Sequence, residues 1–459
     1  MATRKRFLSL KVATVFLAAV GVAVFAVNEL TVRWTSDGRW ALPAVECERL
    51  ASNFKIQTVA ELPEQIASLI CDNDGPNSHH LFVGTRGKAG VYRCSPRSPF
   101  GVMPLIPATG DDPGFGTAQV SVLALTDAPR DQQELIALTA QETPRGKPRA
   151  YVFKMPMMTP VMTAADIASS WPHGIAFVKD VFGRPTFLSA FCGFGEIVEF
   201  RTFDRKTAAG FRSNGLECRQ LGSVSGSGEQ ISAVELLGSN PYVLVARGYK
   251  FNGAAIEVYG RDHTTPFNKA KPGALGLGWA RRWELREGDK FGNVRFLVGA
   301  LRNGVRDLYA WWCVGLADGD TEFVHYRIGL TGIVERKSIA LGPAADYWPQ
   351  ENWSTLVDAD GDGVEELYFM SRTGNLWRLD LPPADSSDES SAALPEPSLM
   401  GFFPAGGGPI VPCTNDENGV IPLYIAVSNY IVKATPKKAP RQRPIVQVKL
   451  AEPSSAAHR

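Results

Sequence analysis

The stretch Asp358-Ala-Asp-Gly-Asp-Gly-Val-Glu-Glu-Leu-Tyr-Phe369 determines how the rest of the chain is interpreted. It places carboxylates at positions 358, 360 and 362, and the glycines at 361 and 363 free the backbone to curl so that these side chains converge. Three aspartates at this spacing repel one another unless a cation lies among them. The stretch therefore predicts a cage of oxygen ligands that suits calcium better than zinc or a transition metal, with a polar β-turn as the alternative.

The residues after the cage predict a loop between two strands. An EF-hand begins in the same way, but it requires a bidentate Glu at position twelve and a helix afterwards. Position twelve is Phe369, and residues 367–370 (Leu-Tyr-Phe-Met) are typical of a buried strand. The expected calcium ligands are the side chains of Asp358, Asp360, Asp362 and Glu366 and the backbone carbonyl of Val364.

At these residues the sequence resembles the FG-GAP or VCBS repeats, the calcium-loop β-propellers that include the head of the integrin α-chain. The family pattern D-x-D-x-D-G-x-x-D is met at 358, 360, 362 and 363, with Glu366 in place of the final Asp. The resemblance implies a β-propeller with calcium at this loop. It also implies a role in interaction or adhesion, in some relatives with sugars.

The same order of polar turn, apolar strand, short turn and second strand closing on a basic residue occurs seven times. The closing basic residues lie 47 to 66 positions apart. A period near 50 residues with about four strands each predicts an all-β, seven-bladed propeller, and a pair of β-sandwiches is the alternative. The expected strand pairs are 81–83 and 91–93, 135–138 and 151–154, 186–188 and 198–201, 242–245 and 258–261, 308–311 and 324–327, 367–370 and 376–378, and 423–426 and 430–433.

The propeller is expected over residues 34–435, followed by a Pro-rich basic tail at 436–459. Its closing strand is expected from residues 55–60, in preference to residues 445–450, because the latter follow the Pro-rich stretch. The acidic, Ser- and Pro-rich segment 382–398 is expected to be a disordered insertion. Residues 264–289 are expected to form a long connection that opens the fifth unit.

The N-terminal 33 residues predict a signal anchor or a cleaved signal peptide. Arg4-Lys5-Arg6 and Lys11 precede an uncharged apolar run over residues 12–27. In both cases the positive flank keeps the extreme N-terminus cytoplasmic, so the remaining chain is expected to be lumenal or extracellular, either tethered to the membrane or secreted. A mitochondrial presequence is the third alternative.

Seven cysteines suit such a compartment, where disulfides form. The suggested pairs are Cys71 with Cys94, Cys192 with Cys218, and Cys47 with Cys413, which leaves Cys313 unpaired; spacing alone does not fix this connectivity.

Asn352-Trp-Ser354 is a glycosylation sequon. Asp72 and Asp74 in the first copy keep part of the metal pattern and are a weaker, second candidate calcium site. The pattern is lost in the other copies.

Composition and motifs argue against two classes of function. The formal net charge is +1 with scattered basic residues, so no nucleic-acid footprint is present. Neither a nucleophile elbow nor a phosphate loop occurs, so we expect no enzyme. The resemblance to FG-GAP repeats implies a binding or adhesion head for a protein or glycan partner. The alternatives are a polysaccharide lyase or hydrolase and a structural subunit of a membrane complex. An enzyme would gather ionisable groups with shifted pKa values at the central channel, whereas a binding head would expose an aromatic patch and would have no such cluster.

Overall fold

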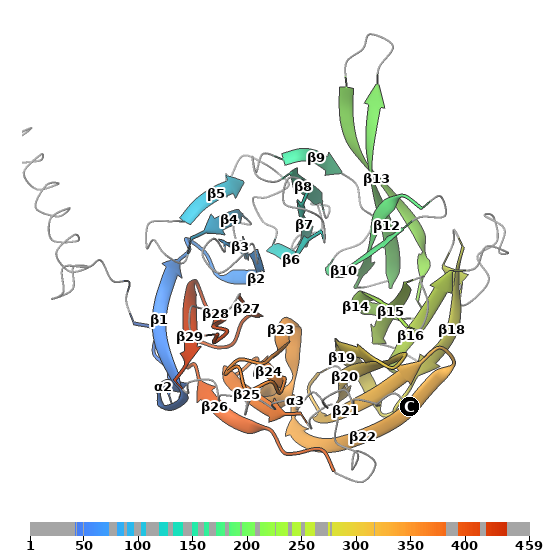
Figure 1. Cartoon of the computed structure of the whole chain (residues 1–459). Coiled ribbons are helices and arrows are strands. Elements are labelled where there is room, and N and C mark those ends of the chain that lie inside the picture. Colours follow the sequence, from blue (N-terminus) through green and yellow to red (C-terminus); the bar gives the residue numbers. More distant parts are fainter. Residues whose placement is uncertain are drawn as a thin grey trace, which may run out of the picture.

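Strands with two apolar faces determine how the sheets of this chain pack. In β20 (Val305–Val314), Leu308, Ala310 and Trp312 join one buried cluster, whereas Tyr309 and Trp311 join another. Successive side chains of a strand point to opposite faces, so both faces of this sheet must be covered by neighbouring sheets. Repeated around an axis, this requirement gives the closed ring of seven antiparallel sheets in Figure 1.

The computed structural model describes the seven sheets and their tight connections. The described residues are 42, 44–48, 50–72, 80–86, 90–95, 102–106, 119–126, 132–140, 149–154, 160–164, 171–179, 183–192, 195–206, 212–224, 226–236, 241–248, 253–261, 274–275, 278–315, 317–381, 393–413 and 419–437.

Each sheet is one blade, and its first strand lies nearest the central axis (Figure 1). Blade one contains β2 (Ile66–Asp72), β3 (His80–Thr85), β4 (Val91–Cys94) and β5 (Val102–Ile106). Blade two contains β6 (Gln119–Leu125), β7 (Glu134–Ala140), β8 (Ala150–Lys154) and β9 (Pro160–Ala164). Blade three contains β10 (Pro172–Lys179), β11 (Pro185–Phe191), β12 (Glu196–Lys206) and β13 (Arg212–Ser223). Blade four contains β14 (Ser227–Val234), β15 (Tyr242–Gly248), β16 (Ala255–Arg261), β18 (Trp279–Leu285) and β17 (Ala274–Leu275).

The last three blades complete the ring. Blade five contains β19 (Phe291–Arg302), β20, β21 (Asp320–Gly329) and β22 (Gly332–Pro343). Blade six contains β23 (Pro349–Val357), β24 (Glu366–Ser371), β25 (Asn375–Asp380) and β26 (Ser398–Phe402). Blade seven contains β27 (Ile410–Pro412), β28 (Leu423–Val427), β29 (Tyr430–Pro436) and β1 (Phe54–Glu61). Two short helices, α2 (Leu50–Asn53) and α3 (Ala344–Tyr347), lie outside the sheets.

The predicted seven blades and their strand pairs are confirmed. Every expected pair coincides with the second and third strands of one blade, from β3 and β4 in blade one to β28 and β29 in blade seven. These are the strands whose two faces are both buried, which explains why their apolar runs were recognisable. Trp311 and Trp312 are fully buried, so they are packing residues.

The N-terminal strand closes the ring, as predicted. β1 pairs antiparallel with β29, from Phe54 opposite Pro436 to Glu61 opposite Tyr430, and becomes the outer strand of blade seven (Figure 1). The amide of Lys437 extends the pairing by donating to the carbonyl of Asn53 at 2.9 Å.

The predicted disulfide pairs are wrong. Cys71, at the end of β2 in blade one, is bonded to Cys413, which follows β27 in blade seven. Their Cα atoms lie 5.9 Å apart although 342 positions separate them in the sequence. The other five cysteines form no disulfide in the described structure. Spacing could not reveal this bond because ring closure alone brings blades one and seven together.

Two expected connections also differ from the structure. Within 264–289, β18 is an outer strand of blade four, so this stretch does not simply open the fifth unit. The predicted disordered segment 382–398 extends too far toward the C-terminus. Leu394 is buried in a core cluster, and Ser398 is the first residue of β26. Residues 382–392 lie outside the described residues.

The N-terminal 33 residues and the tail beyond 437 also lie outside the described residues, so the predicted anchor or signal peptide stays a prediction. Within the part of the chain that is described, no helix is both long and apolar enough to cross a membrane.

Candidate functional site

The connections of the blades define two faces of the ring. In each antiparallel blade, the link from the first to the second strand leaves on one face, and the link from the second to the third leaves on the other. The aspartate loop joins β23 to β24, so we name its side of the ring the Asp-loop face. We name the opposite side the channel face.

The aspartate loop folds as the sequence predicts. One carboxylate oxygen from each of Asp358, Asp360 and Asp362 lies within 4.8 Å of the others. Gly361 and Gly363 have φ values of 74° and 87°, a left-handed backbone that glycine adopts without strain. A strand follows in place of an EF-hand helix.

Loop amides orient the three carboxylates. Gly363 donates to Oδ2 of Asp358 at 2.7 Å, and Val364 donates to Oδ1 of Asp362 at 2.9 Å. Oδ1 of Asp358 is buried and has no hydrogen-bond partner in the described structure. A buried anionic oxygen without a donor is the kind of atom that a cation would satisfy, so these residues fit calcium.

Glu366 lies beneath the loop rather than in the group of three carboxylates. It is 1% exposed, its Oε2 accepts from the amide of Ala359 at 3.1 Å, and its Oε1 lies 3.4 Å from Arg378. Burial raises the pKa of Glu366 to about 7, with a further contribution from the charges of Asp360 and Asp362. It is therefore close to the loop, and its role as a ligand, like that of the Val364 carbonyl, stays a prediction.

The remaining sequence-predicted sites have mixed outcomes. Asp72 is buried at the end of β2, whereas Asp74 lies outside the described residues, so the second calcium site is not tested. Asn352 is exposed on β23 with a φ of 62°, at an irregularity in the strand register. Its glycosylation stays a prediction.

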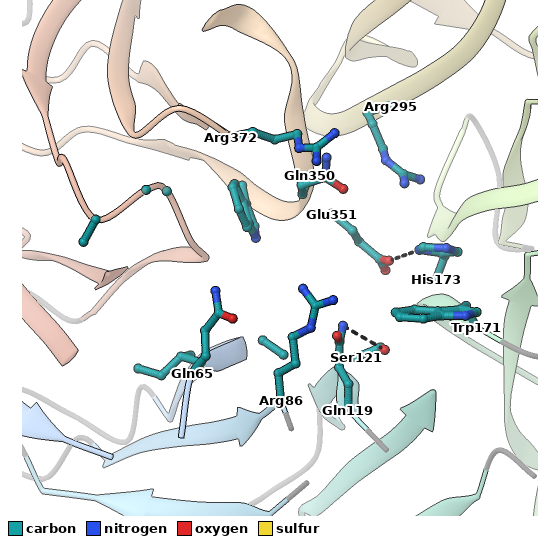
Figure 2. Close-up of a pocket in the computed structure, with 16 residues that line it drawn as sticks. Gln65, Arg86, Gln119, Ser121, Trp171, His173, Arg295, Gln350, Glu351 and Arg372 are labelled. Carbon is teal, nitrogen blue, oxygen red and sulfur yellow. Dashed lines mark hydrogen bonds and ion pairs between the residues drawn. The ribbon is translucent and has the colours of Figure 1, made fainter. Parts of the chain in front are cut away.

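A second site, which the sequence did not reveal, lies in the central channel (Figure 2). It is a pocket of about 500 Å³ whose walls come from the starts of first strands and from the loops after second strands. Those positions place it at the channel face, opposite the aspartate loop. Its lining comprises Gln65, Ile66, Ala67, Arg86, Gln119, Ser121, Trp171, His173, Arg295, Gln350, Glu351, Trp353, Arg372, Ala405, Gly406 and Gly407.

His173 is the centre of a charged cluster in this pocket. Its Nδ1 lies 2.9 Å from Oε2 of Glu351 (Figure 2). Glu351 lies near the start of β23, 178 positions later in the sequence. Burial alone would lower the pKa of His173, but hydrogen bonds to Cys192 and Glu351 and the charge of Glu351 outweigh it and raise the pKa to about 9. The imidazole is therefore cationic at neutral pH.

Arg295 provides a second, deeper cation. It is 5% exposed, and its Nη2 lies 3.2 Å from Oε2 of Glu229 on β14. Burial would raise the pKa of Glu229, but Arg295 and His173 outweigh it and hold the pKa below its ordinary value. The carboxylate stays ionised behind the guanidinium, whose Nε has no hydrogen-bond partner in the described structure.

Sequence reasoning missed this pocket for a physical reason. The repeats align on their second and third strands, whereas the pocket residues lie mainly on first strands and on short turns. First strands face a neighbouring blade and the channel, so their apolar runs are interrupted by polar residues such as Gln119, His173 and Glu351. A polar residue near the start of most first strands, with blade seven as the exception, was the available signal.

No protein-family model and no curated protein matches the chain. Among solved structures, it is similar to a chain in the crystal structure of BBS1N in complex with ARL6DN, soaked with lead. The superposition has a TM-score of 0.45 at 11% identity and covers 88% of this chain and 99% of that chain. This likeness concerns the fold alone.

The cluster around His173 predicts an unusually acidic thiol at Cys192. Burial would raise the pKa of Cys192, but the hydrogen bond and positive charge of His173 bring it below its ordinary value. Iodoacetamide labelling of Cys192, followed by mass spectrometry from pH 5.5 to 9.5, should therefore reach half its maximal rate below pH 9. In His173→Gln the midpoint should rise.

Cys47 is the internal reference for this experiment, because burial raises its pKa. It should be labelled with a higher midpoint, and that midpoint should not change in His173→Gln. A Cys192 midpoint above that of Cys47, or one insensitive to the substitution, would contradict the described cluster.

Proposed function

We propose that this seven-bladed propeller is a calcium-supported binding protein that docks a protein partner on its Asp-loop face. The observation that carries the proposal is a set of exposed apolar side chains on the same face of the ring as the aspartate loop. Four large hydrophobic residues of blade five are exposed to solvent: Leu301 by 39%, Leu330 by 38%, Ile333 by 48% and Val334 by 61%. We name them the blade-five tip.

The blade-five tip lies on the same face as the aspartate loop. Leu301 adjoins the β19–β20 turn, and Leu330, Ile333 and Val334 lie at the β21–β22 turn. Both turns are on the Asp-loop face by the antiparallel order of the blade. Apolar side chains gathered on one exposed edge are typical of a surface that contacts another protein.

An ion pair connects this edge to the calcium loop. Nη2 of Arg302 lies 3.8 Å from Oε2 of Glu365, which lies between the predicted ligands Val364 and Glu366. Both side chains are substantially exposed, so the pair contributes little to stability. It does place the loop beside Leu301, the member of the tip on β19, which supports a role for calcium in shaping this part of the docking face.

The calcium loop supports an FG-GAP-like assignment at blade six. Calcium would be held by Asp358, Asp360 and Asp362, with the Val364 carbonyl and Glu366 completing the set. When bound, the ion would neutralise the three clustered carboxylates and thereby stabilise the β23–β24 connection.

We further propose that residues 1–33 direct or tether the ring to the lumenal or extracellular side of a membrane.

The cluster in the channel favours an enzyme as the second candidate. Cys192, His173 and Glu351 are connected in the order of a nucleophile, a base and an orienting carboxylate. However, Cys192 is not among the residues that line the pocket, although His173 and Glu351 are. Binding is therefore the function that the geometry supports better.

Calcium should stabilise the protein through the aspartate loop. At calcium concentrations about 100-fold above the dissociation constant, binding contributes about 2.7 kcal/mol, so the melting temperature of the parent should rise by about 2–5 °C relative to protein in chelator. Asp360→Asn keeps the size of the side chain but removes one charge, so it should abolish most of this rise. Differential scanning fluorimetry with and without chelator measures both values.

Glu365→Gln is the matched control, because Glu365 is a carboxylate of the same loop outside the predicted ligand set. It should retain the parental response. An equal calcium response in Asp360→Asn and the parent would contradict the calcium site.

The docking face can be tested with a photo-cross-linking amino acid in place of Ile333, in cells that express the full chain. We expect a discrete cross-linked protein that is lost on addition of Val334→Glu and reduced by chelator, because the first change adds a charge to the blade-five tip and the second removes the ion. The same amino acid at Ala405, an exposed position on the channel face, is the control. Identical cross-links from both positions, or none from Ile333, would exclude the Asp-loop face as the docking surface.

A further inference from the structure

We propose that the pocket in the central channel binds a small acidic sugar, that is, a hydroxylated ring carrying a carboxylate, sulfate or phosphate group. The inference concerns the channel face and does not depend on the calcium loop or on a protein partner. Four features of the pocket carry it: its charge, an unpartnered buried donor, its amide side chains and its two tryptophans.

The pocket has an excess of positive charge. Arg86, His173, Arg295 and Arg372 line it, against one lining carboxylate, Glu351 (Figure 2). Among the described residues, even when Glu229 behind Arg295 is included, four cations face two carboxylates. Arg372 is exposed and has no ion-pair partner among the described residues, so its charge is available to a ligand. A concave surface with this imbalance attracts anions.

Two buried polar atoms from the neighbouring blades five and six, both near His173, have no partner in the described structure. Nε of Arg295 belongs to a side chain that is 5% exposed, and Figure 2 shows its guanidinium at the rim of the pocket, extending toward His173. Oε1 of Glu351 is likewise buried without a hydrogen bond in the described structure. One is a donor and the other an acceptor, so an occupant that satisfies both carries acceptor and donor groups.

The remaining polar side chains are those that recognise hydroxyl groups. Gln65, Gln119 and Gln350 come from three different blades and offer both amide donors and carbonyl acceptors, and Ser121 adds a hydroxyl. In Figure 2 the labelled amides surround the same opening as the arginines. A bare inorganic anion would leave these acceptors unused.

Trp171 and Trp353 provide the apolar surfaces. Both line the pocket and both are only partly buried, and Trp353 also packs against the core of blades six and seven. An aromatic ring packs against the C–H face of a sugar while the hydroxyls at the ring edge meet polar partners. A volume of about 500 Å³ suits one such ring and its substituent rather than a long polymer segment.

Isothermal titration calorimetry on the full chain tests the proposal with glucuronate, glucose 6-sulfate and glucose 6-phosphate as acidic probes. Glucose and inorganic phosphate are the neutral-sugar and bare-anion controls. We expect at least one acidic sugar to bind more tightly than both controls, with an affinity that falls as salt rises. Which of the three binds most tightly identifies the acid group.

Arg372→Gln should weaken the preferred acidic sugar about five- to tenfold, because it removes one charged hydrogen-bond donor from an exposed position without disturbing the core. Arg219→Gln, an exposed arginine on β13 outside the pocket, should bind as the parent does. An unchanged melting temperature in both variants shows that they are folded, and Arg372→Glu should abolish binding.

Three results would overturn the proposal: no heat with any acidic sugar, glucose or phosphate binding as tightly as the best acidic sugar, or equal affinities for Arg372→Gln and the parent. The titrations are repeated in chelator. Because the channel and the aspartate loop lie on opposite faces, failure of the calcium site leaves channel binding intact, and the two proposals fail separately.

Discussion

The pairing of β1 with β29 is the interaction on which the rest of the structure depends. Each blade buries its two faces only against its neighbours, so an open array would expose one face of blade one and one face of blade seven. The hydrogen bonds between Phe54–Glu61 and Tyr430–Pro436 convert the array into a ring, and the Cys71–Cys413 bond joins blades one and seven on the Asp-loop face. Core clusters then continue across the join, since Leu69 and Tyr424 belong to the same cluster.

Ring closure also creates the channel pocket. His173 and Glu351 are 178 positions apart, and they come from the first strands of blades three and six. Their hydrogen bond across the axis therefore forms only when the blades between them are stacked in order. The outer, apolar parts of each blade hold the ring together, whereas polar residues of the inner strands are left to face the channel.

The sequence allowed prediction where local pattern and tertiary environment agree. Residues 308–313 read as a continuous apolar run because both faces of β20 are covered, and Asp358, Asp360 and Asp362 converge because the intervening glycines permit a tight loop. Prediction failed for residues that come into contact only when the ring of blades closes. The partner of Cys71 and the neighbours of His173 lie in distant blades, and no local spacing encodes them.

The most direct test of this account is disulfide mapping of the oxidised protein, with thiols alkylated before proteolysis and the linked peptides identified by mass spectrometry. A ring closed between blades one and seven predicts a linked peptide pair containing Cys71 and Cys413, and alkylated Cys47, Cys94, Cys192, Cys218 and Cys313. Linkage of Cys71 to Cys94 would contradict the described structure, because these residues lie opposite Leu81 on either side of β3 and Cys71 would no longer join blade one to blade seven.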